Sequence, residues 1–273
     1  MAFSSLNVRE QIVKTVVRSG NGGAVWVPKN WLGQEVVVIL PQKPELETKE
    51  KIINLLEPYL KDITSVFIYG SYARKEQTKE SDVDLMIISE KPLKLNIKDP
   101  KLEITVFELD KLKKAIEKYP VMYHQIVQEA EPLINGHVLD ELKGIKIKNK
   151  NFIGYINETQ EHIKSSKELL ELDRLDGSLV KSYSAVYSII LRLRGIFIMK
   201  CIISRSKFSN KSFRKWIMGK GVGNAEFSQF YDIYRGVRDN KKIKNVSIKI
   251  SSAEKLLNIA EKELSSVEAK VNG

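Results

Sequence analysis

The chain has 273 residues, of which 42% are hydrophobic, and its formal net charge at pH 7 is +11. This length exceeds that of a typical single domain, so we expect two or three domains with a globular composition. The single cysteine, Cys201, excludes an internal disulfide and suits a reducing compartment, so we expect a cytoplasmic protein. The most hydrophobic stretch, residues 183–203, contains Arg192, Arg194 and Lys200, which favours a buried helix over a membrane span.

Positive charge is concentrated toward the C-terminus. Residues 200–249 contain 13 Lys and Arg against 3 Asp and Glu, with aromatic residues such as Phe213, Trp216 and Tyr231 among them. A polyanion, above all nucleic acid, is the natural partner of such a stretch. A solvated helical surface would have the same composition, so both interpretations stay open.

Residues 8–41 show short extended patterns separated by turn residues. The stretch "QIVKTVV" alternates between two faces, "RSGNGG" supplies turn chemistry, and "AVWVP" resumes the extended pattern. The following "NWLGQEVVVILP" predicts a turn at Gly33 and a further strand. A unit this short cannot bury a core alone, so we expect it to pair with a second copy or to pack on its neighbour.

This segment consists of a predicted strand, the stretch "RSGNGGAVWVPKNWLG" and a second predicted strand. This order resembles the swapped-hairpin DNA-binding domains of the AbrB type. The resemblance implies a homodimer formed through residues 1–43. It also implies that basic residues face DNA, among them Arg9, Lys14, Arg18 and Lys29. A plain β appendage that only dimerises is the alternative.

Residues 46–143 alternate helical and extended patterns. The stretch "TKEKIINLLEPYLKD" predicts a helix, and "ITSVFIYG", "SDVDLMIIS" and "KLEITVFEL" predict three strands. The segment after these strands returns to a helical pattern that Pro120 breaks or restarts. Strands that alternate with helices indicate an α/β layer in which helices cover one sheet.

The residues that suggest chemistry lie in "FIYGSYARKEQTKESDVDLMII". Gly70 lets the chain turn sharply against a ligand, and Ser71 can cap a following helix whose free N–H groups favour a phosphate. Asp82 and Asp84 project from one face of a strand, where two carboxylates repel each other unless cations lie between them. Hard oxygen ligands favour Mg²⁺, which carries a nucleotide's phosphates. Glu103 lies on the next predicted strand at a position whose side chain should point to the same face as Asp82 and Asp84, so it could supply a third carboxylate.

This stretch resembles the hallmark of the minimal nucleotidyltransferases of the DNA polymerase beta superfamily, in which GS precedes a helix and S-D-x-D lies on a strand. The resemblance implies that four residues bind a nucleoside triphosphate (NTP): Gly70, Ser71, Arg74 and Ser81. It also implies that Asp82 and Asp84 bind Mg²⁺ and that Glu103 is a third metal ligand or the base for an acceptor hydroxyl. Two positions depart from the pattern: Lys75 stands where Gly is usual, and Glu103 where Asp is more frequent.

Residues 149–273 contain four segments with apolar residues at spacings of three and four, which predict an antiparallel helical bundle. The helix with Tyr183 and Tyr187, the stretch "FYDIYRGVRDNKK" and a final helix resemble the HEPN domain, which often accompanies a minimal nucleotidyltransferase. A helical substrate-binding domain of antibiotic-type nucleotidyltransferases is the alternative. HEPN nucleases have a His four to six residues after an Arg. No His follows His162, so the resemblance implies RNA binding without cleavage.

The predicted fold is α+β and multidomain. It has a small β domain at residues 1–43, an α/β nucleotidyltransferase domain with a mixed sheet at 44–148, and an antiparallel helical bundle at 149–273. The predicted function is Mg²⁺-dependent transfer of a nucleoside monophosphate (NMP) from an NTP to a hydroxyl on RNA, protein or a small molecule. The alternative is a DNA-binding regulator or antitoxin-like protein with a degenerate nucleotidyltransferase domain. We expect no membrane partner, no zinc site and no P-loop.

Overall fold

The computed structural model describes residues 14–36, 38, 43–78, 81–243 and 246–272, which fall into two compact units that divide between Glu50 and Lys51. The first unit contains strands β1 (Val17–Ser19) and β2 (Gly22–Ala24), and the 3-10 helix Lys29–Trp31. Helix α1 (Lys43–Leu56) runs across the division. The second unit holds every later element.

The N-terminal hairpin has no core of its own among its described residues. Strands β1 and β2 pair antiparallel around a turn in which Gly20 has a φ of +57°, as the "RSGNGG" stretch predicted. No residue from 14 to 36 is buried, and Trp26 and Leu32 are each 73% exposed. The strand predicted after Gly33 is absent from residues 34–36 and 38, and residues 37 and 39–42 lie outside the described part.

The second unit contains a mixed sheet in the order β5-β4-β3-β6. Its strands are β3 (Ser65–Tyr69), β4 (Val83–Ser89), β5 (Leu102–Glu108) and β6 (Glu131–Ile134). Strand β3 pairs antiparallel with β4 and β6, whereas β4 and β5 are parallel. The three strands predicted from apolar runs are therefore confirmed as β3, β4 and β5, and the predicted mixed sheet is present.

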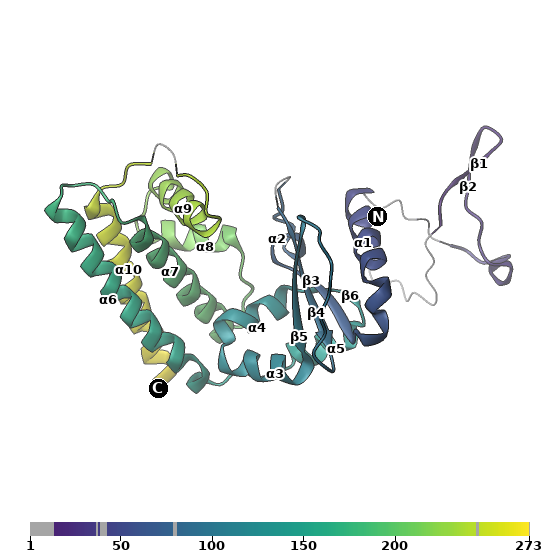
Figure 1. Ribbon diagram of the computed structural model, residues 1–273, viewed down its shortest axis with the longest axis horizontal. Coiled ribbons are helices and arrows are strands. Elements are labelled where there is room, and N and C mark those ends of the chain that lie inside the picture. Colours follow the sequence, from purple (N-terminus) through teal and green to yellow (C-terminus); the bar gives the residue numbers. More distant parts are fainter. Residues whose placement is uncertain (1–13, 37, 39–42, 79–80, 244–245, 273) are drawn as a thin grey trace. The chain divides into compact units, whose positions relative to one another are not determined.

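Helices cover both faces of this sheet (Figure 1). On one face, Phe67, Met86 and Ile88 pack against α3 (Leu109–Lys118), α4 (Pro120–Glu129) and α5 (Gly136–Lys143). On the other face, Ile68, Leu85 and Ile87 pack against Ile52 and Leu56 of α1. Because side chains alternate along each strand, the central strands bury both of their faces, which explains their continuous apolar runs.

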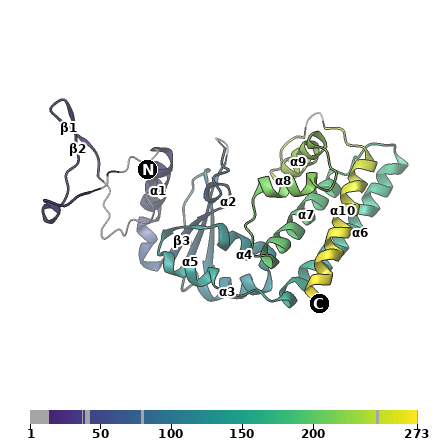
Figure 2. The ribbon, with the colours of Figure 1, turned by 180° about the vertical axis from the view of Figure 1, so that it is seen from behind.

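The C-terminal part is a helical bundle with its own core. Its helices are α6 (Ile153–Leu175), α7 (Tyr183–Ile203), α8 (Asn210–Met218), α9 (Asn224–Arg238) and α10 (Ile250–Asn272). Helices α6 and α10 lie side by side in both views (Figures 1 and 2). Residues Val180 and Ile248, just before α7 and α10, share a backbone hydrogen bond, so these two helices begin together and α6 runs antiparallel to both.

Helix α7 is the centre of the bundle, as its apolar sequence predicted. It contacts α4, α6, α9 and α10. Its charged Arg192 is only 7% exposed and pairs with Glu158 of α6 at 3.0 Å, although its Nε has no hydrogen-bond partner among the described residues. A buried charge is tolerated when a partner and hydrogen bonds compensate it. No helix in the described ranges is long and apolar enough to cross a membrane.

Candidate active site

The turn between β3 and the short helix α2 (Gly70–Ala73) requires glycine for two reasons. Gly70 has a φ of +70°, in the left-handed region that other residues enter at a cost. A Cβ at this position would also lie 1.9 Å from Oδ2 of Asp84. Gly70 thus lets the backbone approach the Asp84 carboxylate more closely than any side chain would allow.

Strand pairing brings Asp84 and Glu103 next to each other. Asp84 on β4 is the register partner of Glu103 on the parallel strand β5 and of Tyr69 on the antiparallel strand β3. Asp82 precedes β4 by one residue and is exposed, whereas Asp84 is half-buried. The parity argument from the sequence therefore places Glu103 correctly beside Asp84, while the roles of the three carboxylates stay predictions.

The carboxylates affect one another electrostatically. Burial and then the charge of Glu103 raise the pKa of Asp84 to about 6, and Glu129 and Asp82 add to this effect while Arg74 opposes it. Burial also raises the pKa of Tyr69, and the charges of Asp84, Glu103 and Glu129 raise it further. Clustered carboxylates favour a cation between them, and oxygen ligands suit Mg²⁺.

The donor set fits a divalent cation in its chemistry. Within the described ranges, however, no three His, Cys, Asp or Glu side chains are grouped closely enough to hold a metal ion by themselves. If Glu103 is not the third carboxylate, Asp99 and Glu108 are the next candidates in the sequence, but both are already paired, Asp99 with Lys51 and Glu108 with Lys111. Glu103 is therefore the candidate that β5 places next to Asp84.

The residues flanking the turn differ in part from expectation. Helix α2 is only four residues long, its N-cap position is Tyr69, and no side chain caps it, so Ser71 does not have the predicted capping role. The Oγ of Ser81 accepts a hydrogen bond from the Thr78 backbone N–H at 2.9 Å and so shapes the loop before Asp82. Binding of nucleotide by Ser71 and Ser81 stays a prediction.

Lys75 ends helix α2 in a strained conformation. Its φ is +56°, in the left-handed region, and its backbone N–H donates to the Tyr72 carbonyl at 3.1 Å. Glycine adopts this conformation without the Cβ penalty and commonly follows the end of a helix. This geometry explains why the minimal-nucleotidyltransferase pattern has Gly here, and it shows that Lys75 keeps the turn at a cost.

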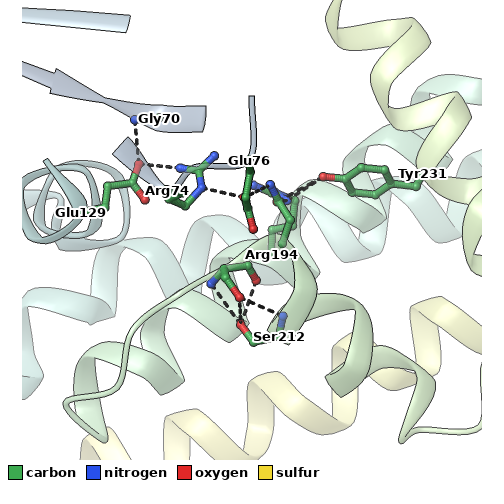
Figure 3. Close-up of polar contacts among 9 residues, drawn as sticks. Gly70, Arg74, Glu76, Glu129, Arg194, Ser212 and Tyr231 are labelled. Carbon is green, nitrogen blue, oxygen red and sulfur yellow. Dashed lines mark hydrogen bonds and ion pairs between the residues drawn. The ribbon is translucent and has the colours of Figure 1, made fainter. Parts of the chain in front are cut away.

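Arg74 is held between two carboxylates, neither of which the sequence indicated. Its Nη1 donates to Oε1 of Glu129 at 2.6 Å, and its Nε donates to Oε2 of Glu76 at 2.9 Å (Figure 3). The same Oε1 of Glu129 also accepts from the Gly70 backbone N–H at 3.1 Å. Burial alone would lower the pKa of Arg74, but the charge of Glu129 and the bonds to both carboxylates raise it above its ordinary value.

The comparison with protein families identifies the class of this domain. Residues 50–151 match the family described as "Polymerase beta, Nucleotidyltransferase". The matched range contains the whole four-stranded sheet, helix α2 and the three candidate carboxylates. The chain therefore carries a nucleotidyltransferase domain, and it is an enzyme of the kind that transfers a nucleoside monophosphate.

Two solved structures show a distant likeness over most of the chain. A spectinomycin adenyltransferase from Enterococcus faecialis, solved with ATP and spectinomycin, is 13% identical, with a TM-score of 0.40, and the match covers 82% of this chain and 100% of that one. A nucleotidyltransferase-like protein from Exiguobacterium sibiricum 255-15 is 11% identical, with a TM-score of 0.34, and the match covers 81% of this chain and 74% of that one. The comparison with curated proteins gave no match.

Proposed function

We propose that this protein is a Mg²⁺-dependent nucleotidyltransferase that moves an NMP from an NTP to a hydroxyl group of an acceptor. The observation that carries the proposal is the placement of Asp84. Strand β5 sets Glu103 beside it, and the Gly70 turn lies directly against its carboxylate. A glycine turn beside paired carboxylates offers a place for phosphates next to a place for a cation.

In this proposal each residue has a separate task. Asp82 and Asp84 would hold the cation, which supplies positive charge that neutralises the phosphate oxygens. The Gly70 turn, with Ser71, Arg74 and Ser81, would bind the phosphates of the NTP. Glu103 would hold the same cation or accept the proton of the acceptor hydroxyl. The hydroxyl oxygen would then form a bond to the α-phosphorus while the bond from that phosphorus to the bridging oxygen breaks and pyrophosphate leaves.

Labelling identifies the reaction and the acceptor together. The purified protein is incubated with Mg²⁺ and each α-³²P-labelled NTP, together with total cellular RNA, protein or small-molecule extract. We expect label in one acceptor fraction, and we expect none with Asp82→Asn or Asp84→Asn, which should keep the wild-type melting temperature. Undiminished transfer by either variant would refute the metal assignment. Glu103→Gln should reduce transfer strongly; if it does not, the third carboxylate lies elsewhere.

A second proposed function is DNA binding by a homodimer of the N-terminal unit, residues 1–43. Three basic residues of the described hairpin region, Lys14, Arg18 and Lys29, are exposed, and its apolar side chains have no core to fill. Cations on one unit bind phosphates and release counterions, so affinity should fall steeply as salt increases. Electrophoretic mobility shift with duplex DNA at increasing salt tests this; binding that salt does not weaken would contradict it. A DNA-binding regulator with little transferase activity is the corresponding alternative.

We further propose that the helical bundle, residues 149–273, holds an RNA without cutting it. Exposed basic residues gather on α8, on α9 and in the segment after α9: Lys211, Lys215, Arg235, Arg238, Lys241 and Lys242. Arg235 pairs with Asp232, and Asp239 pairs with both Arg238 and Lys241. Among the described contacts, this leaves Lys211, Lys215 and Lys242 as the freer phosphate ligands. Metal-independent cleavage of single-stranded RNA that is lost in Arg238→Ala would refute this proposal and indicate a nuclease.

A further inference from the structure

We propose that Glu129 and Asn210 are positioning residues that hold Arg74 for the phosphates of the nucleotide, so that the helical bundle contributes to nucleotide affinity through Asn210. This inference rests on the proposed function, because it takes Arg74 and the Gly70 turn as the phosphate-binding groups. Neither Glu129 nor Asn210 belongs to the GS and SDxD motif. The two residues reach the turn from α4 and α8 respectively.

Glu129 joins both phosphate-binding groups at one atom. Its side chain is 9% exposed, and its Oε1 accepts from the Gly70 N–H at 3.1 Å and from Arg74 Nη1 at 2.6 Å. Its Oε2 is buried and has no hydrogen-bond partner among the described residues. A buried carboxylate oxygen without a partner costs stability, so the unpaired Oε2 needs an explanation beyond the two bonds that Oε1 makes.

The two carboxylates leave one edge of Arg74 open. A guanidinium has five N–H donors; Nε bonds to Glu76 and Nη1 bonds to Glu129, while Nη2 bonds to no residue in the described part of the chain. The Arg74 side chain is 17% exposed, so it is largely fixed before any ligand arrives. Holding the guanidinium in one orientation reduces the entropy lost when a phosphate binds to its remaining donors.

Asn210 fixes Glu76 from the helical bundle. Its Nδ2 donates to Oε2 of Glu76 at 2.8 Å, while its Oδ1 accepts from Arg194 Nη1 at 2.7 Å and faces the Tyr231 hydroxyl at 3.3 Å. Because Arg194 has only donors, Asn210 must present its oxygen to Arg194, which turns its amide NH₂ toward Glu76. Figure 3 shows that Arg194 and Tyr231 approach the Glu76 side of Arg74, opposite Glu129.

Arg194 is itself held by aromatic rings. Its guanidinium carbon lies 5.2 Å from the ring centroid of Phe208 and 5.6 Å from those of Phe213 and Tyr234. Cation–π contacts with several rings restrict an arginine without using its hydrogen-bond donors. Arg194 is thus held in one orientation. It fixes Asn210 by a hydrogen bond, Asn210 fixes Glu76, and Glu76 fixes Arg74.

The proposal can be tested without knowledge of the acceptor. Calorimetric titration of the full chain with each of the four NTPs, in the presence of Mg²⁺, measures nucleotide binding. We expect Glu129→Gln to weaken binding about tenfold, because Arg74 loses a charged hydrogen-bond partner. Asn210→Ala should weaken it less, about threefold, because Asn210 acts on Arg74 only through its hydrogen bond to Glu76. Where transfer can be followed, KM for the NTP should rise while kcat changes less.

Matched controls separate positioning from general destabilisation. Glu158→Gln removes a carboxylate from another Glu–Arg pair, with Arg192, in the bundle. Asn224→Ala removes an asparagine that, like Asn210, begins a helix and bonds to an arginine, Arg214. Both controls should bind the nucleotide as the unaltered chain does, even where their melting temperatures fall.

Each other result overturns the inference. Equal affinity in Glu129→Gln, Asn210→Ala and the unaltered chain would show that the contacts are only structural. Tighter binding in Glu129→Gln would show that Glu129 competes with phosphate for Arg74 and Gly70 instead of positioning them. An unaltered chain that binds none of the four NTPs in the presence of Mg²⁺ would refute the proposed function itself, which is a different result from unchanged affinity in the variants.

Discussion

Replacing Gly70 with alanine tests whether the turn after β3 must lie against Asp84. Gly70 has a φ of +70°, where a side chain costs roughly 1–2 kcal/mol. The new Cβ would lie 1.9 Å from Oδ2 and 2.9 Å from Cγ of Asp84. Because such contacts are too short for non-bonded atoms, either the carboxylate or the turn must move by about 1 Å, the scale at which misplaced catalytic groups lose activity.

The expected losses differ between activity and stability. A displacement of about 1 Å costs about 100-fold in rate, so kcat/KM should fall by about that factor, or about 2.7 kcal/mol of transition-state stabilisation. The free energy of unfolding should fall less. The backbone penalty of roughly 1–2 kcal/mol is partly offset, since alanine restricts the unfolded chain by about 0.4–1 kcal/mol.

Gly221→Ala is the matched control, because Gly221 also has a positive φ, of +85°, but nothing lies within 4 Å of a Cβ built there. Guanidinium unfolding followed by circular dichroism should show a loss of stability in both variants, because both put a side chain at a positive φ. Transfer of labelled NMP should fall only in Gly70→Ala. If Gly70→Ala transfers as fast as Gly221→Ala, the contact with Asp84 is not needed for the reaction and the reasoning fails.

Local patterns predicted the parts of the site that lie on adjacent strands. Apolar runs marked β3, β4 and β5, and the two-residue period of a strand placed Asp84 and Glu103 on one face before their pairing was known. Gly70 and the carboxylates were detectable because they are unfavourable without a ligand. A glycine costs conformational entropy, and neighbouring carboxylates repel each other unless a cation lies between them. The mixed sheet and the helical bundle also followed from alternation and periodicity.

Contacts between distant segments could not be predicted in this way. Glu129 ends a helix in a segment where a glutamate is typical of a solvated surface, yet it bonds to Arg74, 55 residues earlier. Asn210 bonds to Glu76 across 134 residues. The length of α2 could not be predicted either, because a lysine side chain does not indicate the left-handed φ with which Lys75 follows this one-turn helix.

Three further predictions concern the rest of the chain. Lys75→Gly should raise the free energy of unfolding by about 0.5–1 kcal/mol, measured by guanidinium unfolding, because glycine removes the left-handed strain; an unchanged or lower value would contradict this. Burial alone would raise the pKa of Asp173, but hydrogen bonds from Ser182 and Lys181 lower it below the ordinary 3.8, so its stabilisation is present above that pH and is lost as pH falls through the depressed pKa. Asp173→Asn should therefore destabilise the bundle by about 1.5–3 kcal/mol at pH 7, and by less below pH 4, in unfolding curves at both pH values; an equal loss at both would refute it. Deleting residues 1–43 should convert a dimer to a monomer in light scattering, because the described hairpin has no buried residue and Trp26 and Leu32 are each 73% exposed, so a second copy is the cover that its apolar side chains need. A truncated chain that still measures as a dimer would place the interface elsewhere in the chain.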